Sequence, residues 1–323
     1  MRRSYKLRLA TDSNSMDTQK QKIKEKAIEL GFAFCGFAKA VALEEDLAFF
    51  TNYIREKRNA GLDYLEREPE KRTDPRKVYK GAQTVIGLLM NYFPGETLPA
   101  EDNFIISKYG YGQDYHEVLK ARTTSLVQFM NEQCGPLNAK AFIDSGPVLE
   151  KAWAQRCGLG WRGKNTILIN PSKGSFHFIA IILTDLIREP DLPEKDHCEN
   201  CHLCMDACPT GALEAPYTLN PAKCISFLTL KEKNEISREL LDKFQGRIYG
   251  CDTCQDVCPY NRFAVPHSTP EFFISERLKN MRKNDWLRLT REEFGILFKE
   301  SAVKRTGYEK LMKNISSLRV NTT

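Results

Sequence analysis

The chain has 323 residues, 41% of them hydrophobic, and a net charge of +6, which allows two domains or one large domain with an insert. It contains no apolar run of transmembrane length, and its basic N-terminus lacks the apolar core of a signal peptide. We therefore expect a cytoplasmic protein without a membrane partner, working as a monomer and beginning with a disordered extension over residues 1–16.

The first half of the chain alternates between helical and strand patterns. Apolar residues at helical spacing predict helices over residues 17–30, 43–58 and 114–134, and a further helix that starts at Pro147 and ends at Arg156. Short apolar runs predict strands over residues 85–89, 141–143, 167–170 and 176–183, the last buried on both faces. This alternation predicts an α/β (α+β) domain over residues 17–188.

Eight of the eleven cysteines lie between residues 198 and 258. Cys198, Cys201, Cys204 and Cys208 follow the bacterial ferredoxin spacing, and Cys224, Cys251, Cys254 and Cys258 complete the set. A cubane needs four thiolates, so eight cysteines supply two [4Fe–4S] clusters. The stretch predicts a ferredoxin-like domain over residues 189–262.

The ferredoxin spacing also predicts which cysteines share a cluster, because the fourth cysteine of a run binds the other cluster. Cys198, Cys201, Cys204 and Cys258 are then one ligand set, and Cys208, Cys224, Cys251 and Cys254 are the other. The alternatives are a zinc site, a c-type haem attached at residues 198–202, and disulfides. Each of them accounts for fewer of the eight cysteines or needs an exported protein.

The C-terminal segment, residues 263–323, is predicted to be a basic helical tail. From Arg262 onward there are thirteen Lys or Arg against seven Asp or Glu, so the tail carries the whole net charge. Phe294, Leu297 and Phe298 are expected to pack it onto the body. A basic end on a neutral body suggests a nucleic-acid partner, and the alternative is a solvated helical face.

Three segments of the first domain are candidates for a ligand site. Asp144 ends a predicted strand, where ligands of α/β proteins bind, although it could instead cap the following helix. The glycine-rich segment 158–165 permits close approach of a planar or phosphate-bearing ligand. The segment 107–116 combines glycines with aromatic side chains, and we expect its His116 to bond the backbone at a helix start.

Taken together, these motifs resemble the epoxyqueuosine reductase family. The resemblance covers residues 20–315 and rests on the order of five segments: Asp114-Tyr115-His116, 144–151 (DSGPVLEK), 158–166 (GLGWRGKNT), the ferredoxin run, and 224–229 (CISFLT). It implies a nitroreductase-like domain that holds cobalamin, fed through two [4Fe–4S] clusters by a low-potential electron donor. The implied substrate is a tRNA anticodon loop carrying epoxyqueuosine, from which the epoxide oxygen is removed to give queuosine.

The resemblance also implies roles for particular residues. Asp144 matches the proton donor. The residues implied to surround cobalamin are Arg67, Ser107, Tyr109, Asp144, Lys164, Asn165, Ser226 and Asp252, and those implied to bind tRNA are Lys304 and Arg305. Longer family members carry additional helical repeats after this point, so the chain resembles a short form. Two other functions stay open: a corrinoid iron–sulfur reductase of a small molecule, similar to reductive dehalogenases, and a non-catalytic ferredoxin-type electron carrier.

Overall fold

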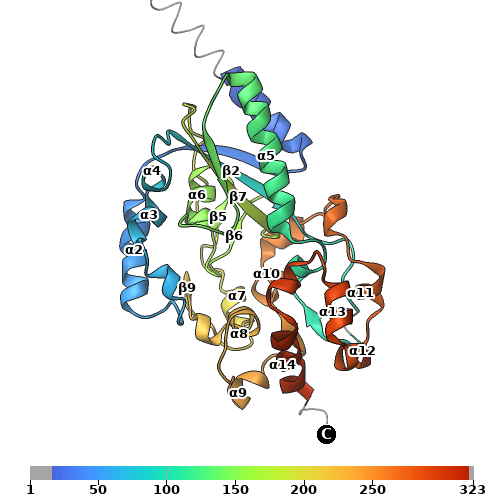
Figure 1. Cartoon of the computed structure of the whole chain (residues 1–323). Helices are drawn as coiled ribbons and strands as arrows, with labels where there is room; N and C mark the ends of the chain where they lie inside the picture. The colour runs from blue at the N-terminus through green and yellow to red at the C-terminus, as the bar shows by residue number, and fades with distance from the viewer. Residues whose placement is uncertain (1–16, 100, 320–323) are drawn as a thin grey trace, which may run out of the picture.

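A computed structural model describes residues 17–99 and 101–319 of the chain (Figure 1). The predicted extension over residues 1–16 lies outside the described residues. Within the described part, no helix is both long and apolar enough to cross a membrane. The helices α2 (Glu44–Arg55), α3 (Pro69–Thr73) and α4 (Pro75–Val78) lie at one edge of the molecule, and the sheet lies near its middle. The opposite edge holds α12 (Lys283–Arg288), α13 (Arg291–Leu297) and α14 (Tyr308–Arg319).

The sheet of the first half has four strands in the order β1 (Phe34–Lys39), β2 (Thr84–Asn91), β7 (His177–Thr184) and β4 (Ala139–Phe142). The predicted mixture of helices and sheet is confirmed. All three strand pairings are antiparallel, so the α+β form of the prediction describes the sheet and the α/β form is wrong. Strand ends therefore alternate between the two edges, and the end of a strand does not by itself define a ligand crevice.

The central strands β2 and β7 are covered on both faces because their residues alternate between two cores. Ile86 and Ile182 belong to one core and Val85 and Leu183 to the other. The burial on both faces expected for residues 176–183 is confirmed. Such strands read as continuous apolar runs, since neither face meets water.

One face of the sheet is covered by the first helix (residues 17–29) and by α5 (Tyr115–Cys134). Ile23 is fully buried in this core, as its helical spacing predicted. Asp114 caps α5 through the amide of His116, and Gly135 ends it with φ of 81°. Both ends of this helix agree with the prediction.

The other face is covered by α6 (Glu150–Arg156), whose Trp153 is buried against the sheet. The prediction that this helix begins at Pro147 is wrong, because residues 143–149 form a loop and α6 starts three residues later. The end of α6 lies very close to β1. A Cβ atom added to Gly36 would lie 2.0 Å from the carbonyl oxygen of Cys157, so only glycine fits there.

A third core joins distant parts of the sequence: residues 98–111, 225–249 and 278–318. Here β3 (Ile105–Ile106) pairs in parallel with β10 (Arg247–Tyr249). Phe294 and Phe298 are buried in this core, as expected, and Asn314 donates to the carbonyl oxygens of Thr229 and Ile248. The predicted domain boundaries at residues 189 and 263 stay a prediction, and the segment 98–111 packs with the C-terminal half.

The remaining elements are short. In the first half they are α2 (Glu44–Arg55), η1 (Asp63–Leu65), α3 (Pro69–Thr73), α4 (Pro75–Val78), η2 (Lys108–Gly110), β5 (Trp161–Arg162) and β6 (Leu168–Ile169). From the cysteine segment onward they are α7 (Leu203–Asp206), β8 (Leu213–Ala215), β9 (Thr218–Leu219), η3 (Pro221–Lys223), α8 (Ile225–Leu230), α9 (Arg238–Leu241), α10 (Thr253–Asp256), η4 (Pro259–Phe263), η5 (Pro270–Phe272), α11 (Glu276–Asn280), α12 (Lys283–Arg288), α13 (Arg291–Leu297), η6 (Ala302–Arg305) and α14 (Tyr308–Arg319).

We predict that Gly36→Ala destabilises the protein by about 1–3 kcal/mol, because the new methyl group would force α6 away from β1. The matched control is Gly295→Ala in α13, where a Cβ meets nothing within 4 Å and the helix gains about 0.5–1 kcal/mol. Thermal unfolding of the two variants measures the difference. An unchanged Tm for Gly36→Ala would show that β1 and the end of α6 can move apart without loss of stability.

Candidate functional site

The cysteine segment contains two short helices, α7 with Cys204 and α10 with Cys254. Cys198, Cys201, Cys204 and Cys258 line one small hollow together with Lys164 and Tyr260. The thiol of Cys254 interacts electrostatically with those of Cys251, Cys224, Cys204 and Cys208. The structure thus brings the eight cysteines close together, and their division into two ligand sets stays a prediction.

Polar hydrogens point at the sulfurs of both groups. The indole nitrogen of Trp161 donates to Sγ of Cys198 over 3.4 Å, and the amide of Ala212 donates to Sγ of Cys208 over 3.2 Å. Burial raises the pKa of the Cys224 and Cys254 thiols, so their thiolates need a positive charge close by. Iron supplies that charge, and hydrogen bonds to sulfur tune a cluster's potential. The donor set fits two cubanes.

A site for a single metal ion differs from the ligand set of an iron–sulfur cluster. Among residues 17–99 and 101–319, no group of three or more His, Cys, Asp or Glu side chains is arranged to hold one metal ion.

A cavity of about 930 Å³ opens beside this segment, and we call it the large cavity. Its wall is built by α2, η1 and α3 on one side and by residues 144–152 and 162–166 on the other, with residues 217–219 of the β8–β9 hairpin at a third side. Asp196 is part of the wall, and its carboxylate accepts the amide of Cys198 over 2.7 Å. The large cavity is therefore directly linked to the first cysteine group.

Asp144 lies on the wall of the large cavity, in the loop between β4 and α6. Its side chain is 67% exposed, and its φ of 48° places it in the left-handed region. The hydroxyl of Tyr115 donates to Oδ2 over 2.8 Å, and Nε2 of His116 lies 3.8 Å from the same oxygen. The alternative that Asp144 caps α6 is wrong, because Leu149 occupies the cap position and no side chain caps the helix.

His116 does not bond the backbone through its ring, contrary to expectation. Its Nδ1 lies 2.6 Å from Oδ1 of Asp114, the residue that also caps α5. Asp114 in turn lies 3.5 Å from Nη1 of Arg305, one of the two cations implied to bind tRNA. Both Lys304 and Arg305 are exposed on η6.

The glycine-rich segment 158–165 reaches the cysteine runs with its last two residues. Nζ of Lys164 donates to the carbonyl oxygens of Glu199 and Cys201, the latter over 3.0 Å. The side-chain amide of Asn165 donates to the carbonyl oxygen of Cys254 over 3.2 Å. Both residues line the hollow at the first cysteine group rather than the large cavity.

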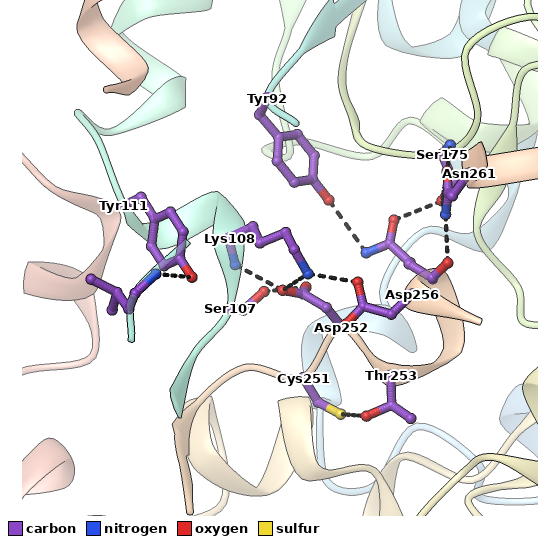
Figure 2. A network of polar contacts seen from close by, with 12 residues as sticks. Tyr92, Ser107, Lys108, Tyr111, Ser175, Cys251, Asp252, Thr253, Asp256 and Asn261 are labelled. Carbon is purple, nitrogen blue, oxygen red and sulfur yellow. Dashed lines mark hydrogen bonds and ion pairs between the residues drawn. The ribbon is translucent and has the colours of Figure 1, made fainter. Parts of the chain in front are cut away.

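Ser107 and Asp252 bond each other in a buried polar network (Figure 2). The Ser107 hydroxyl donates to Oδ1 of Asp252 over 2.5 Å, and the amide of Lys108 donates to Oδ2 over 2.8 Å. Burial raises the pKa of Asp252, against the lowering effect of the Lys108 charge. Asp252 follows Cys251 directly, so this network fixes one cysteine loop against the segment 107–111.

The other residues implied to surround cobalamin lie elsewhere. Tyr109 packs against Tyr249 with ring centroids 5.4 Å apart. Arg67 is exposed and Ser226 is half-buried, and neither belongs to the wall of the large cavity. Of the eight implied residues, Asp144 alone lines that cavity among the described residues, and the assignment of the other seven stays a prediction.

Three further residues of the wall of the large cavity were not singled out in the sequence. Glu150 accepts the amide of Asp144 through Oε1 over 2.6 Å. Lys151 donates to the carbonyl oxygen of Thr166, and burial lowers the pKa of its ammonium group. Tyr64 lies close enough to Asp144 for its charge to raise the tyrosine's pKa, although burial is the larger cause. Glu150 and Lys151 end the segment 144–151 on which the resemblance was based, which is the signal that pointed to them.

Two groups of four cysteines beside a large cavity in an α+β domain define an iron–sulfur oxidoreductase with two clusters. Residues 197–261 match the family described as "4Fe-4S double cluster binding domain", and residues 72–145 match "Epoxyqueuosine reductase QueG, DUF1730". The chain is 44% identical to the epoxyqueuosine reductase of Cellulophaga algicola over 306 residues, which are 95% of this chain and 100% of that protein. It belongs to the epoxyqueuosine reductase family, so the resemblance inferred from its motifs is confirmed.

Solved structures of the family have the same fold. An epoxyqueuosine reductase with an epoxyqueuosine-modified tRNA-Tyr stem loop matches with a TM-score of 0.86 and 28% identity, covering 94% of this chain and 81% of that one. The Bacillus subtilis epoxyqueuosine reductase, in a structure with its catalytic aspartate loop swung out of the active site, matches with the same TM-score, identity and coverage.

We predict that Cys224→Ala removes one cluster, because its thiolate is the distant member of the second group. Iron content should fall from about eight atoms per chain to about four on the four-iron stoichiometry. Cys134→Ala, which changes a cysteine outside both groups, is the control and should keep the full content. Eight iron atoms in Cys224→Ala would contradict the ligand set.

Proposed function

We propose that this protein reduces epoxyqueuosine to queuosine at the wobble position of tRNA, the last step of queuosine synthesis. The observation that carries the proposal is the position of Asp144. Its exposed carboxyl lies on the wall of a cavity of about 930 Å³ that reaches the first cysteine group through Asp196. A proton donor and an electron source thus adjoin one space in a member of the epoxyqueuosine reductase family.

The large cavity is the proposed site of cobalamin, in a domain of nitroreductase-like type. Phe49, Phe50 and Tyr53 give its wall an apolar part that suits a flat corrin ring, and Lys151 and Arg162 give it cations. The fit of the residues therefore supports the cofactor that the family implies. When bound, cobalamin supplies the reducing electrons for the carbon–oxygen bond of the epoxide.

Asp144 supplies the proton that this reaction requires. Opening an epoxide leaves an alkoxide, and a carboxyl group in contact with it can act as general acid. The hydroxyl of Tyr115 holds Oδ2 of Asp144, and the Asp144 side chain is largely exposed. Asp144 is therefore free to meet a substrate that enters from solvent.

The cysteine segment supplies the electrons in this proposal. A low-potential donor reduces the clusters, and the protein environment sets their potentials through burial and through hydrogen bonds such as that from Trp161 to Cys198. Lys164 and Asn165 fasten both cysteine runs to the loop that borders the cavity. This bracing keeps the distance between the clusters and the cavity fixed.

The tRNA is proposed to approach from the side of η6. Lys304 and Arg305 are exposed there, and Arg305 reaches Asp114 beside the helix that carries Tyr115 and His116. Cations of this kind hold the phosphate backbone while an unstacked base enters the site. The protein would act in the cytoplasm, as a monomer.

For Asp144→Asn we predict retained clusters and retained corrinoid binding but a loss of epoxide reduction of at least about a hundredfold, the range that general acids contribute. The measurement is single-turnover conversion of tRNA bearing epoxyqueuosine, together with the visible spectrum of the anaerobic protein. The matched control is Asp185→Asn, which should turn over normally. Asp185 follows β7 and accepts the amide of Asn138 at the start of β4, the strand end opposite to Asp144. Wild-type activity in Asp144→Asn would refute the role of Asp144, and iron without bindable corrinoid would refute the cobalamin site.

We predict that changing Lys304 and Arg305 to Gln weakens tRNA binding and lowers the slope of log affinity against log salt by about 1.5. Lys22 and Lys80, also exposed, give a double Gln variant with the same change of charge. Binding of the stem loop at a series of salt concentrations separates the two. An identical slope in both variants would support the alternative that the tail is only a solvated helical face.

A further inference from the structure

Asp144 lies in the loop between β4 and α6, and its backbone has an unusual conformation. Asp144 has φ of 48°, and Gly146 two residues later has φ of 103°. A non-glycine residue is disfavoured in the left-handed region, so a contact elsewhere must fix it. Val148 and Leu149 at the end of the loop are partly buried and pack against the core, whereas Asp144 itself is exposed. The contact at Asp144 is therefore a polar one.

Glu150 supplies it. Its Oε1 accepts the backbone amide of Asp144 over 2.6 Å, and this bond is made across the whole turn. Glu150 is the first residue of α6, in which Ala152, Trp153 and Ala154 are buried against the sheet. The carboxyl is thus attached to a rigid element, while the amide that it holds belongs to an exposed loop.

The bond uses a group that would ordinarily stabilise the helix itself. The N-cap of α6 is Leu149, and no side chain caps the helix, although a glutamate in the first turn favours its own helix N-terminus. Here the carboxyl reaches back to Asp144 instead. The N-terminus of α6 therefore has no side-chain cap, and the loop has a hydrogen bond to the first residue of the helix.

We propose that Glu150 is a positioning residue for Asp144: by holding the Asp144 amide it fixes the left-handed turn, so that the Asp144 carboxyl and the Tyr115 hydroxyl meet at the wall of the large cavity. This inference rests on the proposed function, because it assigns a role in presenting the proton donor. The Tyr115 hydroxyl holds the carboxyl group of Asp144, and Glu150 holds the backbone amide of the same residue. With both in place, Asp144 has one orientation.

The charge of Glu150 adds a pH dependence. Burial, and next the charge of Asp144, raise the pKa of Glu150 to about 8. The groups that face this pair are Tyr115 and His116 from α5, Lys151 from α6 and Tyr64 from η1. Below pH 8 Glu150 is neutral, and its carbonyl oxygen still accepts the amide. Above pH 8 it is negative and holds the Asp144 amide more strongly, because a charged acceptor makes the stronger hydrogen bond.

The test compares two variants of Glu150 in the protein loaded with clusters and corrinoid. Glu150→Gln keeps an oxygen that accepts the Asp144 amide but cannot ionise, whereas Glu150→Ala removes the acceptor. Glu132→Ala is the matched control on α5, where the carboxylate accepts only from Gln128 among the hydrogen bonds of the described residues. Each variant is measured by amide hydrogen exchange over residues 139–149 and by kcat and KM for epoxyqueuosine tRNA between pH 6 and 9.

In Glu150→Ala we expect the Asp144 amide to exchange at least about fivefold faster, the factor for a lost hydrogen bond of about 1 kcal/mol, and kcat to fall about tenfold or more with KM unchanged. In Glu150→Gln we expect protected exchange, near-normal kcat at pH 7, and loss of the stronger protection of the Asp144 amide that the wild type gains above pH 8. Normal exchange in Glu150→Ala, or equal damage in both variants, would overturn the proposal. Absence of turnover in the wild type would instead overturn the proposed function, and exchange alone would still decide the positioning role.

Discussion

The arrangement of this protein depends on one buried carboxylate, that of Asp252. It follows Cys251 directly and is bonded by the hydroxyl of Ser107 and the amide of Lys108 (Figure 2). A charge removed from water is tolerated only when such partners surround it. These partners come from the segment that precedes α5. The loop at Cys251 and the start of α5, whose Tyr115 bonds Asp144, are therefore held by the same hydrogen bonds. The spacing between the clusters and the large cavity follows from that anchor.

A second set of polar contacts, formed by Gln255 and Asn261, strengthens the same junction. Gln255 donates to the Tyr92 hydroxyl at the end of β2 and accepts from Ser175, which Asn261 also holds. Polar contacts fix direction more sharply than apolar packing does, because an unpaired buried donor or acceptor costs about 1–3 kcal/mol. The cysteine segment is therefore oriented as well as attached.

The sequence allowed the elements and the clusters to be predicted because those signals are local. Helical spacing located the end of α5 at Gly135, and the cysteine spacing predicted the domain with two clusters that the family match shows. Strand direction is not local, so the antiparallel sheet could not be read from alternating patterns. The start of α6 was misplaced because Pro147 suits a helix start as well as a loop. The contacts of Asp144 were missed because they are not local: its partner Tyr115 lies 29 residues away in the sequence.

The parallel pairing of β3 with β10 also sets the order in which this chain can fold. Residues 105–106 find their strand partner only at residues 247–249, and the core around them is closed by Leu311 and Ile315 of α14. Contacts of such long sequence separation form late and slow folding down. During synthesis Phe104 and Ile106 stay exposed until residues 225–249, and then α14, have been made. The segment that leads into α5 is therefore open to aggregation for longer than the four-stranded sheet, whose last strand ends at Thr184.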